Sequence, residues 1–355
     1  MSDAIRITRA TAKKPKPKDH ELGFGTVFTD HMFVADFQEE KGWYDPRVEP
    51  YGPIPLDPAA AVLHYAQAIF DGLKAFRGQD GRVRLFRPQK HIERMNNSAR
   101  RMCIPPLDPE FALQSLVTLV GLEQAWVPAS VGTALYVRPV IIANEPFLGV
   151  RPAKSYIYYV ILSPVGAYYA EGMNPVKIMV EAEYVRATPG MGAAKTGGNY
   201  AASLYPAEEA HHKGFTQVLW LDARERKYVD EVGTMNIMFR LGDEVVTPPL
   251  TGTILPGVTR DSALTLMREW GLRVAERQIA IDEVIAAARS GRLVEAWGTG
   301  TAAVISPVGE LSYKGERLVI HGGKIGELTQ RLYDAIVGIQ YGTAPDPRGW
   351  TVLVE

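Results

Sequence analysis

The sequence predicts an α+β fold of two lobes with an active site in the cleft between them. The chain has 355 residues, and at roughly 150 residues per domain two domains are expected. Segments with helical spacing of apolar residues precede position 163, and short strands separated by glycine turns follow it. Glycine-rich segments gather in this second half, where they would let the backbone approach a ligand closely.

Three segments of the first half carry apolar residues at helical spacing. A proline opens the second segment, and Asp108 is a candidate N-cap for the third. We expect helices over Ala60–Gly72, Pro88–Met102 and Pro109–Leu119.

The same half contains a predicted hairpin, because Gly78 to Gly81 supply turn conformations between two short apolar runs. The runs are Ala75–Arg77 and Val83–Phe86, and two further strands are expected over Ala134–Ile142 and Tyr156–Leu162.

The second half alternates short strands with three helices. The expected strands are Val176–Val180, Gln217–Trp220, Asn236–Phe239, Arg292–Ala296 and Ala303–Ile305. The expected helices are Thr259–Trp270, Asp282–Ala288 and Ile325–Ile339.

These patterns divide the chain into four parts. We expect a flexible N-terminal arm over residues 1–22, a small α/β domain over 23–162, a linker over 163–174 and a large domain over 175–355. The arm contains Lys13 to Lys18, where prolines alternate with like charges that a packed core cannot use, so a solvated segment is favoured over a phosphate or lipid site.

The composition argues against polyanionic partners. A formal net charge of -1 gives no general attraction to nucleic acid or to an anionic membrane, so a small-molecule function is favoured.

Cys103 is the one cysteine and lies among helix-patterned apolar residues, so we expect a buried thiol in a reducing compartment. The charged N-terminus lacks the apolar core of a signal peptide, and a cytoplasmic protein is expected.

One lysine stands out in the segment GMGAAKTGGNY, residues 190–200. Lys195 is surrounded by glycines and alanines, whereas a surface loop would more often hold several polar residues around its lysine. A lysine that forms a Schiff base needs a confined pocket that lowers its pKa. A mobile loop remains the alternative, because glycine-rich loops are common.

Three later segments could contact a charged ligand. Asp230 and Glu231 stand at the mouth of an apolar strand, where one carboxylate could lie beside a ring nitrogen or both could face water. A Pro256-Gly257 turn precedes a helix whose first N–H groups could bind an anion, or the turn could be an ordinary helix start. The turn GTGTAA, residues 298–303, offers further N–H and hydroxyl donors, or simply connects two strands.

In this order, the lysine loop, EVGTMN, LPGVTR and GTGTA resemble the class IV (fold-type IV) aminotransferases. Four first-half segments, FTDHM, HYAQAIFDGLKAFRG, FRPQKHIERM and YVRPVIIANEPFLGV, are similar to the branched-chain-amino-acid aminotransferases in particular. The resemblance runs from about Phe24 to the C-terminal helix. It implies reversible transfer of the amino group between leucine, isoleucine or valine and 2-oxoglutarate, with pyridoxal 5'-phosphate (PLP) as cofactor.

The resemblance also assigns roles to residues that bind the cofactor. Lys195, in the large domain, would be the covalent anchor and general base, and Glu231 would hold the ring nitrogen protonated, which leaves Asp230 as a solvated carboxylate. Arg94 would bind the phosphate with the N–H groups of Val258 and Thr259. The other cofactor contacts that the family implies are Tyr200, Thr234, Leu255, Gly257 and Thr301.

The family likewise implies a set of substrate contacts, most of them apolar. The side chain would lie among Phe24, Phe70, Tyr168, Thr234 and Ala302. The α-carboxylate would meet Tyr65, Thr301 and Ala302, and Tyr136 and Arg138 would face the pocket from one strand. In the family's homodimer, the loop Leu148–Val150 would reach the partner's active site with Val150. For each aromatic residue taken alone, core packing is the competing interpretation.

Two alternatives and one departure complete the prediction. A D-amino-acid aminotransferase or an aminodeoxychorismate lyase would share Lys195 and Glu231 but not the first-half motifs, and a PLP-binding scaffold without turnover would not need every catalytic position filled.

The C-x-x-C pair of some relatives is absent, because those positions hold Ala303 and Ser306. The pairs His211-His212 and His91-Ile92-Glu93 lack the remaining ligands of a zinc site, so no metal is expected and they are interpreted as surface residues.

Overall fold

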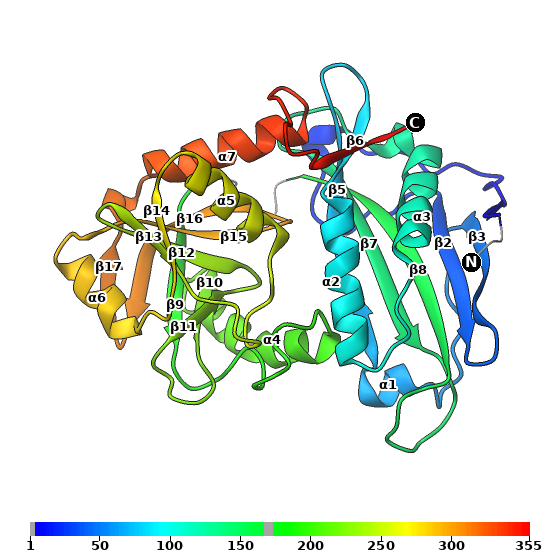
Figure 1. The fold of residues 1–355 in the computed structure, drawn as a ribbon, viewed down its shortest axis with the longest axis horizontal. Helices are drawn as coiled ribbons and strands as arrows, with labels where there is room; N and C mark the ends of the chain where they lie inside the picture. The colour runs from blue at the N-terminus through cyan, green and yellow to red at the C-terminus, as the bar shows by residue number, and fades with distance from the viewer. Residues whose placement is uncertain (1–3, 167–172) are drawn as a thin grey trace. The chain divides into compact units, whose positions relative to one another are not determined.

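The computed structural model describes residues 4–166 and 173–355, shown in Figure 1. The chain forms two compact units. The first contains Met1–Tyr168, Ala194–Gly197 and Gly338–Glu355, and the second contains Tyr169–Ala193 and Gly198–Val337. Helices and sheets occur in both units, which confirms the α+β fold expected from the sequence.

The described part of the first unit is built on a nine-stranded, mostly antiparallel sheet. Its path is β1 (Arg6–Ile7), β3 (Gly42–Pro50), β2 (His31–Gln38), β8 (Ser155–Val165), β7 (Ala134–Ala143), β5 (Leu73–Arg77), β6 (Val83–Phe86) and β18 (Thr351–Val354), with β4 (Ala68–Phe70) also paired to β7. The last strand brings the C-terminus beside β6, as Figure 1 shows.

Helices cover this sheet and close its core. They are α1 (Ala61–Tyr65), α2 (Pro88–Arg101) and α3 (Pro109–Leu122), with short 3-10 helices at Asp19–Glu21 and Gln124–Trp126. The helix α2 packs against α3, and α3 contacts β2 and β18. Side chains from both layers, such as Phe33, Leu116 and Leu135, are fully buried in one cluster. Burial of this apolar surface is the main stabilising contribution to the unit.

A second nine-stranded sheet organises the described part of the second unit. Its path is β11 (Val229–Val232), β10 (Gln217–Leu221), β9 (Val176–Glu181), β16 (Val304–Tyr313), β15 (Leu293–Gly300), β12 (Asn236–Leu241), β13 (Glu244–Thr247) and β14 (Arg273–Glu276), with β17 (Glu316–Val319) on β16. The helices here are α5 (Val258–Glu269), α6 (Ile281–Arg289), most of α4 (Gly197–His212) and most of α7 (Glu327–Gln340), with a 3-10 helix at His321–Gly323.

Most of the expected elements are confirmed. Asp108 caps α3, because its side chain accepts a hydrogen bond from Phe111 N at 2.9 Å. The predicted hairpin is the antiparallel pair β5 and β6. The expected strands of the second half are β9, β10, β12, β15 and β16, and its three expected helices are α5, α6 and α7.

The expected helix over Ala60–Gly72 is wrong. The helix α1 ends at Tyr65, because Ala66 takes a left-handed conformation with φ of 50°. The chain then forms β4, which pairs with β7 and buries Ile69 completely. Pairing with a neighbouring strand therefore overrides the helical spacing of this segment.

Cys103 is also misplaced by the prediction, because it is exposed. It follows α2 in the left-handed region, with φ of 54°, and the next residue, Ile104, takes the buried position instead. The apolar residues around Cys103 predicted burial, but the chain turns just after the end of α2 and leaves Cys103 at the surface.

The units depart from the expected domain boundaries at two places. The Lys195 segment groups with the first unit, because Phe70 N donates to Lys195 O at 3.1 Å and Thr196 pairs with Ile69. The C-terminal segment also joins the first unit, through the pairing of β18 with β6. Of the expected linker, residues 163–165 continue β8, and residues 167–172 lie outside the described part of the chain. The helix α4, which begins just after Lys195, was not predicted.

The N-terminal arm is largely exposed, as expected, but it is held against the first unit. Lys14 N donates to Asp30 Oδ1 at 2.8 Å, and Lys14 Nζ donates to Thr29 O at 2.8 Å and lies 4.1 Å from the Tyr51 ring centroid. Ala10 N also donates to the His31 ring at 2.8 Å. The arm, called the strap below, therefore lies against the first unit at Ala10 and Lys14.

The strap supplies a first prediction. Asp30→Ala removes the acceptor for Lys14 N, so the arm should open more often, by roughly 10-fold for one lost charge-assisted bond. Trypsin should then cut faster at Lys13-Lys14 and Lys18-Asp19, the two arm bonds after lysine that proline does not protect. The matched control is Asp36→Ala, which breaks the pair with Arg47 in the same unit. Equal cleavage in both variants would contradict the role given to Asp30.

Candidate active site

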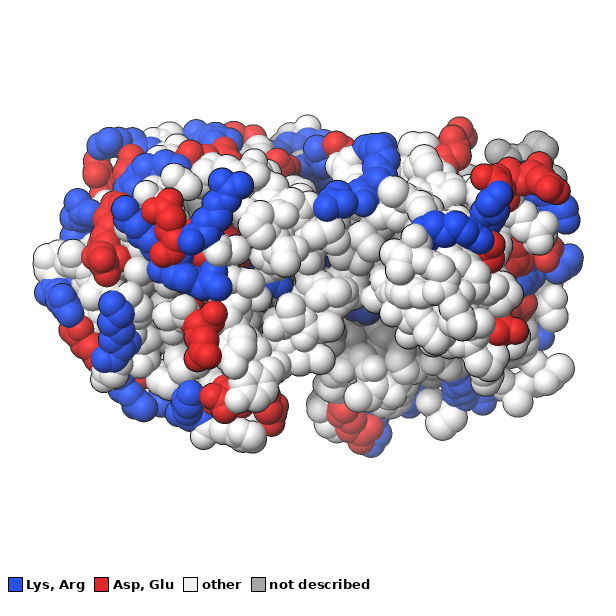
Figure 2. Space-filling view, turned by 90° about the horizontal axis from the view of Figure 1, so that it is seen from below, with Lys and Arg blue, Asp and Glu red and all other residues white. Residues whose placement is uncertain are grey.

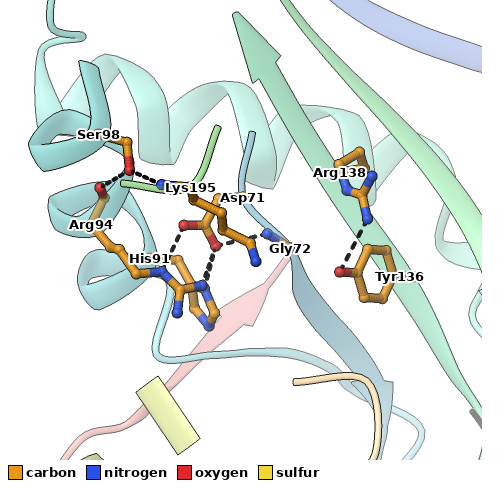
Figure 3. A network of polar contacts seen from close by, with 8 residues as sticks. All are labelled: Asp71, Gly72, His91, Arg94, Ser98, Tyr136, Arg138 and Lys195. Carbon is orange, nitrogen blue, oxygen red and sulfur yellow. Dashed lines mark hydrogen bonds and ion pairs between the residues drawn. The ribbon is translucent and has the colours of Figure 1, made fainter. Parts of the chain in front are cut away.

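Lys195 lies in the first unit, in a short segment whose backbone is fixed from two sides (Figure 3). Its N–H donates to Ser98 Oγ of α2 at 2.9 Å, and its carbonyl accepts from Phe70 N of β4 at 3.1 Å. Its Nζ lies 5.0 Å from the centroid of the Phe70 ring. The glycine-rich sequence around Lys195 thus leads to a held segment and not to a mobile loop.

The electrostatic environment of Lys195 favours the neutral amine. Burial, and after it the Arg94 cation, lower the pKa of Lys195 to about 8, while Asp71 opposes the shift. A neutral amine is the form that can act as a nucleophile or accept a proton. At mildly alkaline pH a large fraction of Lys195 is therefore in a reactive state.

A fully buried carboxylate, Asp71, lies at the centre of the polar network in Figure 3. Arg94 donates to it twice, Nε to Oδ2 at 2.9 Å and Nη2 to Oδ1 at 2.6 Å, and His91 Nδ1 lies 2.8 Å from Oδ1. Although burial opposes ionisation, Arg94 and His91 hold the pKa of Asp71 below its ordinary range.

His91 corrects the interpretation of the His91-Ile92-Glu93 pair as surface residues. The imidazole is buried, and burial lowers its pKa below the ordinary value. Glu93, His211 and His212 are exposed, as expected. A helical face one turn long places His91 and Arg94 together, so the histidine turns inward with the arginine.

Aromatic rings and one arginine gather beside this network, on β4, on β7 and on the segment before β2. Phe24 and Tyr136 make an edge-to-face contact with centroids 5.2 Å apart. The Arg138 guanidinium lies 4.9 Å from the Phe70 ring and 5.2 Å from the Tyr136 ring. Arg138 makes no ion pair with any carboxylate in residues 4–166 or 173–355, and its buried Nε has no hydrogen-bond partner there.

Gly72 is required for this arrangement. A Cβ atom at Gly72 would lie 1.9 Å from Tyr136 Oη, far closer than any real contact. Glycine just before β5 therefore leaves room for the tyrosine hydroxyl, and the requirement is steric.

Three further substrate candidates of the first unit have different positions. Tyr65 is exposed, and its hydroxyl donates to Leu148 O. Val150 is 85% exposed, so the loop Leu148–Val150 projects from the unit with one end fixed by Tyr65. Tyr168, which was expected to line the pocket, lies outside the described residues.

Glu231 in β11 forms the corresponding polar centre of the second unit. Its Oε1 accepts from Asn236 Nδ2 at 2.8 Å and from Leu255 N at 3.1 Å, and its Oε2 lies 2.6 Å from Arg186 Nε. Glu231 is buried, so this pairing is what makes a charged carboxylate tolerable there.

The sequence patterns missed Arg186. Besides Glu231, it contacts two carbonyls, because Nη2 donates to Gly192 O at 3.0 Å and to Thr253 O at 2.7 Å. These carbonyls belong to the lysine loop and to the segment before α5, so Arg186 joins three predicted motifs. A lone arginine in YVRAT carries no sequence signal of this role, and Asp71 and Ser98 were missed for the same reason.

Several predicted cofactor residues share one small pocket of the second unit. Its walls are Arg186, Asn199, Tyr200, Ser203, Glu231, Gly233, Thr234 and Leu255. Four of these eight, Tyr200, Glu231, Thr234 and Leu255, were expected from the family resemblance. The structure thus brings together residues from three segments that are distant in sequence.

The turn before α5 provides backbone donors. Gly257 is the N-cap and contributes no capping side chain, and the first turn contains Val258 and Thr259. A Cβ at Gly257 would lie 2.0 Å from Asn236 Oδ1, so glycine is needed for the contact between this turn and the neighbour of Glu231. Thr301 and Ala302 lie in the turn that joins β15 to β16. An uncapped helix start suits an anion.

Asp230 is not the simply solvated carboxylate that was expected. It is partly buried, and burial raises its pKa to about 6, although Arg186 opposes the shift. Thr253 Oγ1 lies 3.4 Å from its Oδ1. Asp230 and Glu231 therefore differ in their partners, because Glu231 accepts from Asn236 and Leu255 and pairs with Arg186, whereas Asp230 has, in the described part of the chain, the single side-chain hydrogen bond from Thr253.

Three further features of the described residues concern metal ions, membranes and surface charge. No group of three or more His, Cys, Asp or Glu side chains there is arranged to hold a metal ion. No helix in that part of the chain has the length and apolar character to cross a membrane. On the face in Figure 2, basic and acidic side chains are interspersed without a continuous field of one sign.

The lowered pKa of Lys195 supplies a second prediction. In the apoprotein, half of the Lys195 amines should react with an acylating reagent near pH 8, measured by peptide mass spectrometry across neutral and alkaline pH. Arg94→Met should raise this midpoint, because it removes a cation and leaves Asp71 to stabilise the ammonium. Arg100→Met, an exposed change on the same helix, should leave it in place. A midpoint near that of an ordinary lysine would contradict the electrostatic account.

Comparison with known proteins agrees with this geometry. The family model for amino-transferase class IV matches residues 68–311. Branched-chain-amino-acid aminotransferase 2 of Bacillus subtilis (strain 168) is 56% identical over 351 residues, which are 99% of this chain and 97% of the relative. The branched-chain-amino-acid aminotransferase of Mycobacterium tuberculosis (strain CDC 1551 / Oshkosh) is 49% identical and covers 97% of this chain and 95% of its own length.

Solved structures give the same result. A crystal structure of the branched-chain amino acid aminotransferase of Escherichia coli aligns with a TM-score of 0.77 at 25% sequence identity, over 92% of this chain and 99% of that one. The motifs, the two paired carboxylates and the full-length similarity thus lead to one conclusion: this chain belongs to the class IV aminotransferases and, within them, to the family of the branched-chain-amino-acid aminotransferases.

Proposed function

We propose that this protein reversibly transfers the amino group between L-leucine, L-isoleucine or L-valine and 2-oxoglutarate, with PLP as cofactor. The observation that carries the proposal is Lys195, an amine with a pKa of about 8 beside the Phe70 ring, in a chain of this family. Such an amine can form and release a bond to an aldehyde at physiological pH.

The residues present fit the cofactor. Lys195 supplies the amine, Glu231 a buried carboxylate, and the uncapped start of α5 after Gly257 a set of backbone donors for a phosphate. Bound PLP would supply an electron-accepting ring, which lowers the barrier to removing a proton from the substrate Cα. Glu231 would thus face the ring nitrogen of PLP, and the backbone donors of α5 its phosphate.

Lys195 would have two roles in succession. It would hold the cofactor, and after the substrate amine displaces it, the released Nζ would take the proton from the substrate Cα. Burial and Arg94 keep a fraction of Nζ neutral, which is the form that accepts a proton. The contacts of its N–H and carbonyl with Ser98 and Phe70 would keep that nitrogen in place during the exchange.

Glu231 would hold a proton at the pyridine nitrogen. Its Oε1 is engaged by Asn236 and Leu255, and Arg186 pairs with Oε2, so the carboxylate is fixed in orientation and stabilised as an anion. An anion in a buried site favours a protonated neighbour. Asp230, with its raised pKa, has the weaker partners and is not assigned this role.

The phosphate would be bound by Arg94, by the N–H groups of Val258 and Thr259, and by Thr301. Tyr200 would lie beside the ring, with Thr234, Leu255 and Gly257 completing its surroundings. Tyr200, Thr234 and Leu255 share a pocket with Glu231, which supports this grouping.

The substrate side chain would contact the apolar surfaces of Phe24, Phe70, Tyr168, Thr234 and Ala302, with Tyr65, Thr301 and Ala302 at the α-carboxylate. The exposed loop Leu148–Val150 would place Val150 in the active site of the partner in a homodimer. Its 85% exposure and the anchoring of Leu148 by Tyr65 support a projecting contact.

The function is tested by an amino-transfer assay with a panel of amino acids and 2-oxoglutarate. Leucine, isoleucine and valine should be the preferred donors. Lys195→Ala should lower the rate by at least roughly 100-fold, since it removes both anchor and base, and borohydride should then fix no cofactor to the chain. Lys90→Ala, an exposed change on α2, should keep activity. A preference for D-amino acids, or an active Lys195→Ala, would refute the proposal.

Arg138 supplies the fourth prediction, because one pocket must accept both an aliphatic group and the distal carboxylate of glutamate. Arg138→Met should raise the KM for glutamate and 2-oxoglutarate by roughly 10- to 150-fold, the effect of one charge-assisted bond. Leucine and its oxo acid should change much less. Half-reactions measured separately for each substrate decide it, with Arg138→Lys as the charge-preserving control. Equal losses for leucine and glutamate would make Arg138 a structural residue.

A further inference from the structure

A closed circuit of contacts joins the lysine and the phosphate-binding arginine within the first unit (Figure 3). Lys195 N donates to Ser98 Oγ at 2.9 Å, and the same hydroxyl donates to Arg94 O at 3.0 Å. The Arg94 side chain is paired to Asp71. Asp71 follows Phe70 in sequence, and Phe70 N donates back to Lys195 O at 3.1 Å. Each residue of the circuit therefore contacts, or is bonded along the chain to, the next residue, and the last one returns to Lys195.

Two properties of the circuit favour rigidity. Ser98 and Asp71 are fully buried, so water cannot replace a contact that opens. The Asp71 carboxylate engages both Nε and Nη2 of Arg94, which fixes the plane of the guanidinium. His91 Nδ1, 2.8 Å from Asp71 Oδ1, fixes the carboxylate in turn.

We propose that Ser98, Asp71 and His91 are positioning residues that set the span between the Lys195 amine and the Arg94 guanidinium. The circuit would thereby select phosphorylated pyridoxal compounds over their unphosphorylated forms, because a correctly placed arginine adds binding energy only when a phosphate is present. This inference rests on the proposed function and assigns it a basis for cofactor selection.

Helix α2 carries three residues of this arrangement on one face. Arg94 and Ser98 are four residues apart, so they lie one above the other on the same helical face, and His91 is one turn before them. One rigid helix therefore orients both the phosphate contact and the lysine backbone. A change at Ser98 should then alter phosphate recognition without touching a charged group.

The test measures binding by the apoprotein of two probes, pyridoxamine 5'-phosphate and pyridoxamine. The ratio of their dissociation constants gives the contribution of the phosphate. Ser98→Ala should reduce that ratio by roughly 2- to 10-fold, the effect of one buried hydrogen bond. Ser98→Thr, which keeps the hydroxyl, should restore it. The matched control is Ser115→Ala in α3, a fully buried serine whose Oγ also bridges two groups, Ala112 O and Tyr158 Oη.

Asp71→Asn provides a second measurement. It should reduce the ratio by roughly 10- to 150-fold if orientation of Arg94 dominates. It should also lower the pKa of Lys195, because it removes the anion that opposes the shift. If the variant does not fold, Ser98→Ala and His91→Leu, with His91→Asn as the variant that keeps a donor near Nδ1, still decide the matter.

The outcomes are distinguishable. If the unaltered protein binds neither probe, the proposed function fails. If it binds the phosphorylated probe more tightly but Ser98→Ala and Ser115→Ala change both affinities equally, the positioning role is overturned and the proposed function stands. A rise of the ratio in Asp71→Asn would mean that the carboxylate acts by repelling phosphate, which also overturns the inference.

Discussion

The pairing of Asp71 with Arg94 is the interaction on which the candidate site residues of the first unit depend. A carboxylate without solvent contact is costly unless it is paired and hydrogen-bonded, and Arg94, His91 and the N–H of Gly72 satisfy that requirement. The pair joins the end of β4 to the middle of α2. Because Phe70 and Ser98 lie on these two elements and hold the Lys195 backbone, the position of the amine follows from the position of the pair.

The second unit repeats this principle with the roles exchanged. Glu231 is also a buried carboxylate paired to an arginine, and both side chains line the pocket. Arg186 is held in turn by the carbonyls of Gly192 and Thr253. In the first unit the arginine would meet the ligand and the carboxylate supports it. Arg94 and Glu231, two charges that the proposed chemistry uses, are thus each held by an opposite charge of the chain.

The sequence could predict the elements and the chemistry-bearing motifs, because both depend on local pattern. Pro88 and Asp108 mark helix starts, and the glycines around Lys195 indicate a close backbone approach. The supporting residues depend on tertiary contacts and leave no such signal. His91 was interpreted as a surface residue, and Arg94 was assigned to the phosphate by the family resemblance alone. No pattern indicated that both pair with the buried Asp71, and none indicated the role of Arg186. The failure at residues 60–72 has the same origin, since only the neighbouring strand β7 makes β4 a strand.

Arg138 differs from Arg94 and Arg186 in its partners. This difference bears on how one pocket would accept both an aliphatic side chain and a carboxylate side chain. Arg94 and Arg186 are engaged by carboxylates of the chain itself, whereas Arg138 has aromatic neighbours and no carboxylate partner in the described residues. The faces of Phe70 and Tyr136 attract a cation, so the charge of Arg138 is partly compensated when the pocket holds an aliphatic group. In the proposed function, the same guanidinium would form a charge-assisted bond with the distal carboxylate of a glutamate side chain. The rings would therefore serve both substrates, as apolar contact for leucine and as a resting partner for the arginine.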